Sequence, residues 1–189
     1  MSEFFLEVFT EEIPAKLQSS ARNNLLKLFR DFFESESIET HGKEKAYSTP
    51  NRLIIHFDKI KKDIIKKAEE IRGPKIEAPD IAIEGFIKSN NIKKKDIFKK
   101  KTDKGEFYFF KKPKIKLKTH DILEKNIPNI LNSISWNKSM KWGQYQLYWG
   151  RPLKSILAVL DGKTLKFKYH HLNSSNTTYI DKNLEEKTK

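Results

Sequence analysis

Hydrophobic residues recur along the chain in two different periods, which predict both strands and helices. Residues 3–9 form a run rich in aromatic side chains that is typical of a strand. Leu53, Ile55 and Phe57 occupy every second position of residues 52–60, so they share one face of another strand. The remaining runs that predict strands are 44–49, 96–118 around a turn at 103–105, 153–160 and 164–170.

Helical spacing occurs in three places. The longest pattern predicts an amphipathic helix over 14–35 and consists of Leu17, Ala21, Leu25, Leu28 and Phe32. A shorter helix is predicted over 79–90, with Ala82, Ile83 and Phe86 facing inward. A third is predicted over 120–134, where Pro128 is expected to kink or divide it. Residues 62–72 fit either a helix or a strand.

These elements predict an α+β fold with mixed, mainly antiparallel sheets, hairpins and a few amphipathic helices. Strands that pair through short turns argue against a doubly wound parallel sheet. We expect one α+β region over 1–173, with a sub-boundary near 59–75, where Arg72-Gly73-Pro74 breaks the pattern. Residues 174–189 are polar and irregular, and we expect the chain to be truncated there before further domains.

Composition removes several classes of protein. The chain has 189 residues and no cysteine, which excludes a disulfide framework, a Cys-ligated zinc site and a thiol nucleophile. The first residues do not form a signal peptide, and no run of apolar residues is long enough to span a membrane. We therefore expect a cytoplasmic protein with no membrane partner.

Net charge is strongly positive, with 38 Lys and Arg against 25 Asp and Glu, which favours a polyanionic partner. Of the basic residues, 33 are Lys. Lys is encoded by AT-rich codons, so a genome biased toward A and T is an alternative explanation of the positive charge. The charge is uneven, since residues 59–118 hold 20 basic and 9 acidic residues. Arg52, Arg72 and Arg151 each lie near Pro or Gly, where a planar guanidinium would be kept for its geometry.

Catalytic and metal-binding patterns are not found. The tightest acidic cluster consists of Glu7, Glu11 and Glu12. We favour the interpretation that these acids interact with the N-terminal dipole of the following helix over a role in general acid–base chemistry. The five histidines show no metal-ligand spacing, and there is no phosphate-binding glycine loop. The sequence therefore predicts no catalytic residue and no metal ligand.

All three tryptophans lie close together between Trp136 and Trp149, among the cations Lys138, Lys141 and Arg151. Aromatic rings that stack on bases and cations that meet phosphates are typical of a nucleic-acid surface. The alternative is that the tryptophans build the core while the lysines flank them, and for any single tryptophan we favour the core.

Seven short motifs, in order over about residues 3–170, resemble the N-terminal part of the beta subunit of bacterial glycyl-tRNA synthetase. They are Glu7-Val8-Phe9-Thr10-Glu11-Glu12-Ile13-Pro14, Thr49-Pro50-Asn51-Arg52-Leu53, Arg72-Gly73-Pro74, Ala82-Ile83-Glu84-Gly85-Phe86, Lys104-Gly105-Glu106, Lys138-Ser139-Met140-Lys141-Trp142-Gly143, and Arg151-Pro152 before an apolar strand. The family usually has Gly at Phe9 and Arg at Asn51. A Gly-His-Arg-Phe motif expected near 174–179 is not present.

The resemblance implies a non-catalytic part of an α2β2 ligase that attaches glycine to tRNA. A separate alpha subunit would carry the ATP site, this chain would bind no cofactor, and the partners would be the alpha subunit and tRNA-Gly. From chemistry and position we predict tRNA contacts at Arg52, Arg72, Lys138, Lys141, Trp142 and Arg151. The alternatives are a stand-alone basic RNA-binding module and a scaffold domain with no direct RNA contact.

Overall fold

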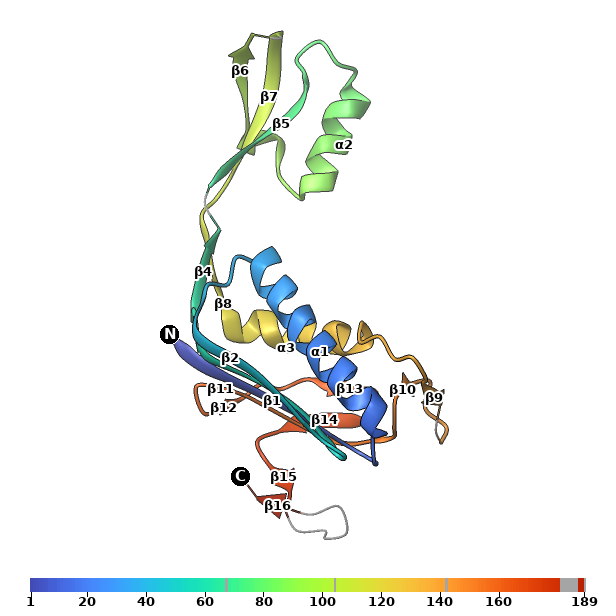
Figure 1. Ribbon diagram of the computed structural model, residues 1–189. Coiled ribbons are helices and arrows are strands. Elements are labelled where there is room, and N and C mark those ends of the chain that lie inside the picture. The colour runs from blue at the N-terminus through green and yellow to red at the C-terminus, as the bar shows by residue number, and fades with distance from the viewer. Residues whose placement is uncertain (67, 104, 142, 181–186, 189) are drawn as a thin grey trace. The chain divides into compact units, whose positions relative to one another are not determined.

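The computed structural model describes residues 1–66, 68–103, 105–141, 143–180 and 187–188. The chain forms two compact units (Figure 1). Unit 1 consists of Met1–Ile64 and Leu117–Lys189, and unit 2 of Ile65–Lys116. The domain limits predicted at 59–75 and at 173/174 stay predictions.

A mixed sheet forms the centre of unit 1, with strands in the order β13-β14-β11-β1-β3-β2 and β12 paired to β11. Neighbouring strands are antiparallel except β11 and β14, which are parallel. The predicted α+β fold is therefore confirmed. The strands are β1 (Ser2–Thr10), β2 (Thr40–Thr49), β3 (Arg52–Ile60), β11 (Leu153–Leu160), β12 (Lys163–Thr164), β13 (Lys168–Tyr169) and β14 (Leu172–Ser175).

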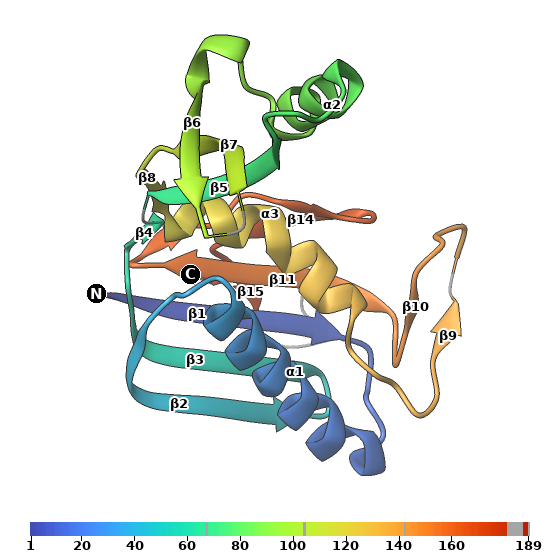
Figure 2. The ribbon, with the colours of Figure 1, turned by 90° about the horizontal axis from the view of Figure 1, so that it is seen from above.

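Two helices, α1 (Ala15–Ser35) and α3 (Thr119–Asn132), cover one face of this sheet (Figures 1 and 2). Alternation along β1 turns Phe4, Leu6 and Val8 toward the helices, where all three are fully buried. The core of unit 1 therefore lies between the helices and this face of the sheet.

Aromatic rings fill the centre of that core. The Phe33 ring lies 4.9 Å from the Phe57 ring and 6.0 Å from the Phe4 ring, and Phe29 lies 5.4 Å from Phe4. Phe29 and Phe33 are more deeply buried than Phe32, although Phe32 belongs to the predicted apolar stripe. Ala21 and Leu25 are buried as predicted, and only in the last turns is the buried stripe one residue further along the chain than the spacing pattern indicates.

The second helix of unit 1 continues through Pro128 as one element, so the proline does not divide it. Leu123, Ile127 and Leu131 on α3 are buried against the sheet. At the end of α3, the Tyr169 hydroxyl donates a hydrogen bond of 2.9 Å to Oδ1 of Asn132. Burial of the ring raises the pKa of Tyr169 far above its ordinary value, because the phenolate would be desolvated.

Unit 2 consists of a three-stranded antiparallel sheet and helix α2 (Asp80–Asn90). Ile83 of this helix is buried as predicted, but Ala82 is exposed, so its predicted inward position is wrong. The ambiguous stretch at 62–72 is extended and not helical where it is described. The sheet strands, in spatial order, are β5 (Glu69–Lys75), β7 (Gly105–Lys112) and β6 (Ile97–Thr102), and a 3-10 turn, η1 (Lys94–Asp96), precedes β6.

Short strands complete the described chain. Three further pairs are formed by strands of two to four residues. They are β9 (Met140–Lys141) paired with β10 (Tyr148–Trp149), β15 (Thr178–Tyr179) paired with β16 (Lys187–Thr188), and β4 (Asp63–Lys66) paired with β8 (Ile115–Lys118). Among the described residues, none of the helices combines the length and the apolar character needed to cross a membrane.

Truncation of Phe33 to Ala tests whether the aromatic cluster holds unit 1 together. The substitution removes a fully buried ring and leaves a cavity, so we expect the free energy of unfolding to fall by about 3–5 kcal/mol. Urea unfolding followed by tryptophan fluorescence measures it, because all three tryptophans belong to unit 1. Tyr47→Ala is the control, since this ring is 50% exposed on β2, and a loss below about 1 kcal/mol is expected. Equal losses in the two variants would contradict this packing.

Candidate nucleic-acid interface

The segment between α3 and β11 is anchored by two tryptophans. Trp149 is 1% exposed, and its ring lies 5.3 Å from the Trp136 ring and 6.1 Å from the Tyr169 ring. The Trp136 ring also lies against Gly150, where an added Cβ would come within 2.3 Å of it, so only glycine fits. These two tryptophans therefore belong to the packed interior and hold the segment in place.

Cations lie on the outer part of the same segment. Lys138 and Lys141 are exposed, and Lys141 pairs with Tyr148 across the β9–β10 hairpin. Tyr148 is 65% exposed, and sequence reasoning did not select it. The predicted contact Trp142 lies outside the described residues. Exposed lysines next to an exposed ring could contact a phosphate and a base respectively.

Arg151 connects this hairpin to the first strand. Its Nε donates a hydrogen bond of 2.9 Å to the carbonyl oxygen of Glu12, and its Nη1 lies 3.7 Å from Sδ of Met140. The N–H of Glu11 donates to the carbonyl oxygen of Pro152 at 2.9 Å. Arg151 thus fixes the base of the hairpin against the turn that follows β1.

The turn between β2 and β3 meets the same end of the sheet. The N–H of Thr10 donates to the carbonyl oxygen of Asn51 at 2.8 Å, and the N–H of Ile13 donates to that of Pro50 at 2.5 Å. Nδ2 of Asn51 donates to the carbonyl oxygen of Thr10 at 3.2 Å. Three motifs that are far apart in the sequence, at 7–14, 49–53 and 151–152, therefore converge here.

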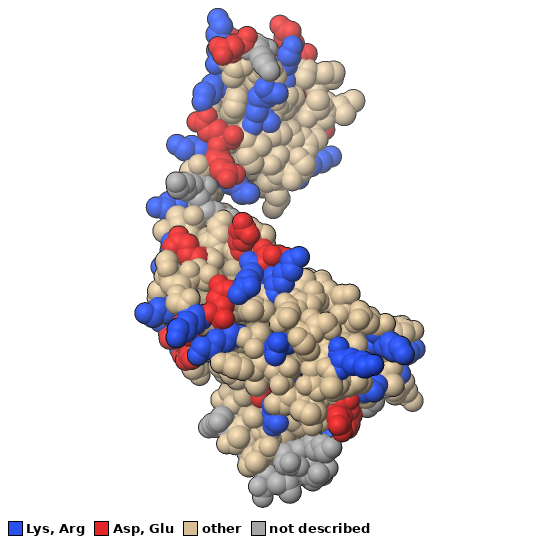
Figure 3. Space-filling model, in the orientation of Figure 1, with Lys and Arg blue, Asp and Glu red and all other residues tan. Residues whose placement is uncertain are grey.

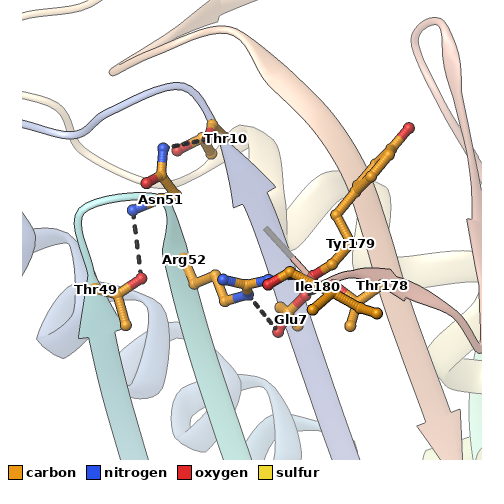
Figure 4. A network of polar contacts seen from close by, with 8 residues as sticks. All are labelled: Glu7, Thr10, Thr49, Asn51, Arg52, Thr178, Tyr179 and Ile180. Carbon is orange, nitrogen blue, oxygen red and sulfur yellow. Dashed lines mark hydrogen bonds and ion pairs between the residues drawn. The ribbon is translucent and has the colours of Figure 1, made fainter. Parts of the chain in front are cut away.

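Arg52 lies on the sheet face opposite the helices, in a polar network around Glu7 (Figure 4). Its Nε is 3.2 Å from Oε2 of Glu7, whose side chain is only 7% exposed. The guanidinium lies 4.6 Å from the centre of the Phe9 ring and donates to the carbonyl oxygen of Tyr179. Thr178 donates a hydrogen bond to the other oxygen of Glu7.

This network ties the segment around Tyr179 to the sheet. The Phe9 ring, at a position where the motif usually has Gly, lies 5.4 Å from the Tyr179 ring. No spacing rule connects Glu7 with Thr178, because the two are 171 residues apart. A buried carboxylate without a partner is costly. The one signal in the sequence was therefore that Glu7, if buried, needs a cation nearby.

The predicted tRNA contacts fall into separate groups. Lys138, Lys141 and Arg151 lie in one segment, whereas Arg52 lies on the second face of the sheet. Arg72 belongs to unit 2, where its guanidinium lies 4.6 Å from the centre of the Phe107 ring. Contact of any of them with tRNA stays a prediction.

The described residues include one group with the donor types of a metal site. Nδ1 of His120 lies 3.7 Å from an oxygen of Asp121 and 3.7 Å from Oε1 of Glu124. That oxygen of Glu124 accepts a hydrogen bond of 2.5 Å from the N–H of Lys166, and Asp121 is largely exposed. The group thus also fits an ordinary helix start, with an acid near the N-terminus of α3.

Arg52→Met tests the network around Glu7. The variant leaves a largely buried carboxylate without its cation. We therefore expect the free energy of unfolding to fall by about 2 kcal/mol, which lies between the costs of breaking an exposed and a buried ion pair. Urea unfolding measures this loss, and limited proteolysis should show faster cleavage near Tyr179. The control is Lys61→Met, which breaks an exposed pair with Glu39. A cost no larger than that of the control would mean that the network does not stabilise unit 1.

Comparison with known proteins identifies the family of the chain. Residues 4–189 match the family model described as glycyl-tRNA synthetase beta subunit. The chain is 42% identical over 179 residues to the glycine–tRNA ligase beta subunit of Rickettsia prowazekii and 41% identical to that of Rickettsia typhi. These alignments cover 95% of this chain and 27% of each relative, so the chain spans about a quarter of their length. The chain therefore belongs to the glycyl-tRNA synthetase beta subunit family.

Proposed function

We propose that the chain acts within glycine–tRNA ligase, where it contributes to tRNA-Gly binding and to assembly of an α2β2 complex. In this proposal the alpha subunit uses ATP to activate glycine, and this chain binds no nucleotide cofactor and supplies no catalytic residue. The observation that carries the tRNA-binding part is the exposure of Lys138 and Lys141, the first just before the β9–β10 hairpin and the second in it.

The charge around the hairpin supports an anionic partner. Residues 125–160 contain five basic residues and no Asp or Glu. In Figure 3, Lys and Arg atoms gather at the right-hand end of unit 1, over the region where Figure 1 draws β9, β10 and the adjacent end of α1, with a smaller group of Asp and Glu atoms just below them. Cations that outnumber carboxylates on one surface favour contact with RNA phosphates.

The second face of the sheet supports a role in assembly. A cavity of about 470 Å³ lies there, lined by the apolar side chains of Phe5, Leu157 and Val159 and by Glu7 and Thr178. The outer edge of β2 pairs with no further strand in the described part of the chain. An apolar hollow and an open strand edge are features that another protein surface could cover.

Removal of both exposed lysines tests the tRNA-binding part directly. We expect Lys138→Ala plus Lys141→Ala to weaken tRNA-Gly binding and to flatten its dependence on salt by about one ion per lost phosphate contact. Affinity is measured at several salt concentrations, with the chain in complex with an alpha subunit. The matched control is Lys27→Ala plus Lys43→Ala, which removes the same charge from exposed positions on α1 and β2.

The same assay separates the alternatives. Equal competition by unrelated tRNA, with or without the alpha subunit, would favour a stand-alone RNA-binding module. Negligible affinity at physiological salt would favour a scaffold domain whose charge is compositional. If the double variant and its control change the salt dependence equally, then the hairpin lysines are not the contact.

A further inference from the structure

We propose that the β9–β10 hairpin binds unpaired nucleotides of RNA, with the Tyr148 ring stacking on a base while Lys141 contacts the adjacent phosphate. This inference rests on the proposed function and names the structural class of RNA that this part of the site takes. It follows from the register of the hairpin, from the support beneath it and from its charge.

Register places the ring and the cation together. Tyr148 and Lys141 are directly opposite in the antiparallel pair, so their side chains project from the same face of the hairpin. Met140 and Trp149 form the other pair; Trp149 is 1% exposed and points into the interior, whereas Met140 is 41% exposed. Alternation therefore directs Tyr148 and Lys141 outward, and Tyr148 is the most exposed tyrosine of the described chain at 65%.

The hairpin presents this pair on firm support. Beneath it, Trp149 packs on Trp136 and Tyr169, and Arg151 contacts the sulfur of Met140. At the hairpin turn, the Tyr145 ring stacks on the His171 ring, with centres 4.0 Å apart and planes 18° apart. These contacts hold the backbone that carries Tyr148, and a ring presented from a supported strand is suited to act as a stacking platform.

The chemistry of the pair selects unpaired bases. The faces of bases inside an RNA duplex are covered by their neighbours, and duplexes are recognised through phosphates, 2′-hydroxyls and shape. A single aromatic ring gains stacking energy only from a base that is exposed on one side. Lys141 next to the ring and Lys138 nearby then supply cations for the backbone of the same strand.

An anionic strand fits the hairpin better than a protein surface does. The flanking residues 125–160 carry no Asp or Glu that would repel phosphate. Within these residues, Lys154 pairs with Glu11 of the preceding turn at 2.7 Å. Stacking does not depend on base identity, so we expect similar binding of different unstructured sequences.

Short labelled RNAs measured by fluorescence anisotropy test the inference. The probes are unstructured oligo-A and oligo-U, a blunt RNA duplex and tRNA-Gly, and the proteins are the 189-residue chain and its variants. We expect Tyr148→Ala to weaken binding of both single strands about five- to a hundredfold while the salt dependence is unchanged, because a stacked ring neutralises no phosphate. Tyr148→Phe should bind normally. Lys141→Ala should weaken binding and flatten the salt dependence by about one ion.

Controls and contrary outcomes are distinct from those of the proposed function. Tyr47→Ala, at a 50% exposed ring on β2, should leave RNA binding unchanged. If the wild-type chain binds tRNA-Gly but Tyr148→Ala and Tyr148→Phe both match it on single strands, the stacking inference is wrong and the proposed function stands. Preference for the duplex would also overturn the inference. Normal RNA binding by Tyr148→Ala with loss of alpha-subunit binding would make the hairpin a protein interface.

Discussion

Unit 1 depends on the burial of strand β1 on both of its faces. The strand lies between β3 and β11, which pair with its two edges. On one face Phe4, Leu6 and Val8 enter the core, whereas on the other Glu7 is held by Arg52 and Thr178. A carboxylate in this position requires a cation and a hydrogen-bond donor, so β1 also dictates the residues that must surround it.

The end of β1 connects this core to the candidate site. The chain leaves the strand at Thr10, and its next backbone groups bond to the turn before Arg52 and to Pro152. Arg151 then donates to the carbonyl oxygen of Glu12 and supports the β9–β10 hairpin through Met140. Motifs that form separate short runs in the sequence are therefore parts of one structural junction, and the exposed lysines project from its outer side.

Sequence patterns predicted the regular elements well because periodicity records which face of an element is buried. The alternation of Leu53, Ile55 and Phe57 and the helical spacing over 14–35 both correspond to observed elements. Pattern reasoning was less accurate where neighbours decide the outcome. Phe33 is buried because it meets Phe4 and Phe57, and Ala82 is exposed because α2 turns Ile83 inward. Neither contact could be read from local spacing.

In the candidate site, too, the sequence pattern predicted the cluster of residues but not which side chains are exposed. The cluster of tryptophans and lysines was visible in the sequence, but the roles of its aromatic residues depend on a two-residue hairpin. Its register buries Trp149 and exposes Tyr148, and a shift of one residue would exchange them. Arg52 was predicted as a tRNA contact, and the structure gives it a structural role as well. Its ion pair with Glu7 makes it part of the packing of the sheet, whether or not it contacts tRNA.

Hydrogen–deuterium exchange of the assembled ligase with and without tRNA-Gly tests the central claim most directly. Bound RNA shields the backbone amides beneath it from solvent and suppresses local opening. Slower exchange over residues 138–151, lost again at high salt, is the expected result. Unchanged exchange in this segment, with protection confined to other parts of the complex, would contradict the assignment of the hairpin as an RNA contact.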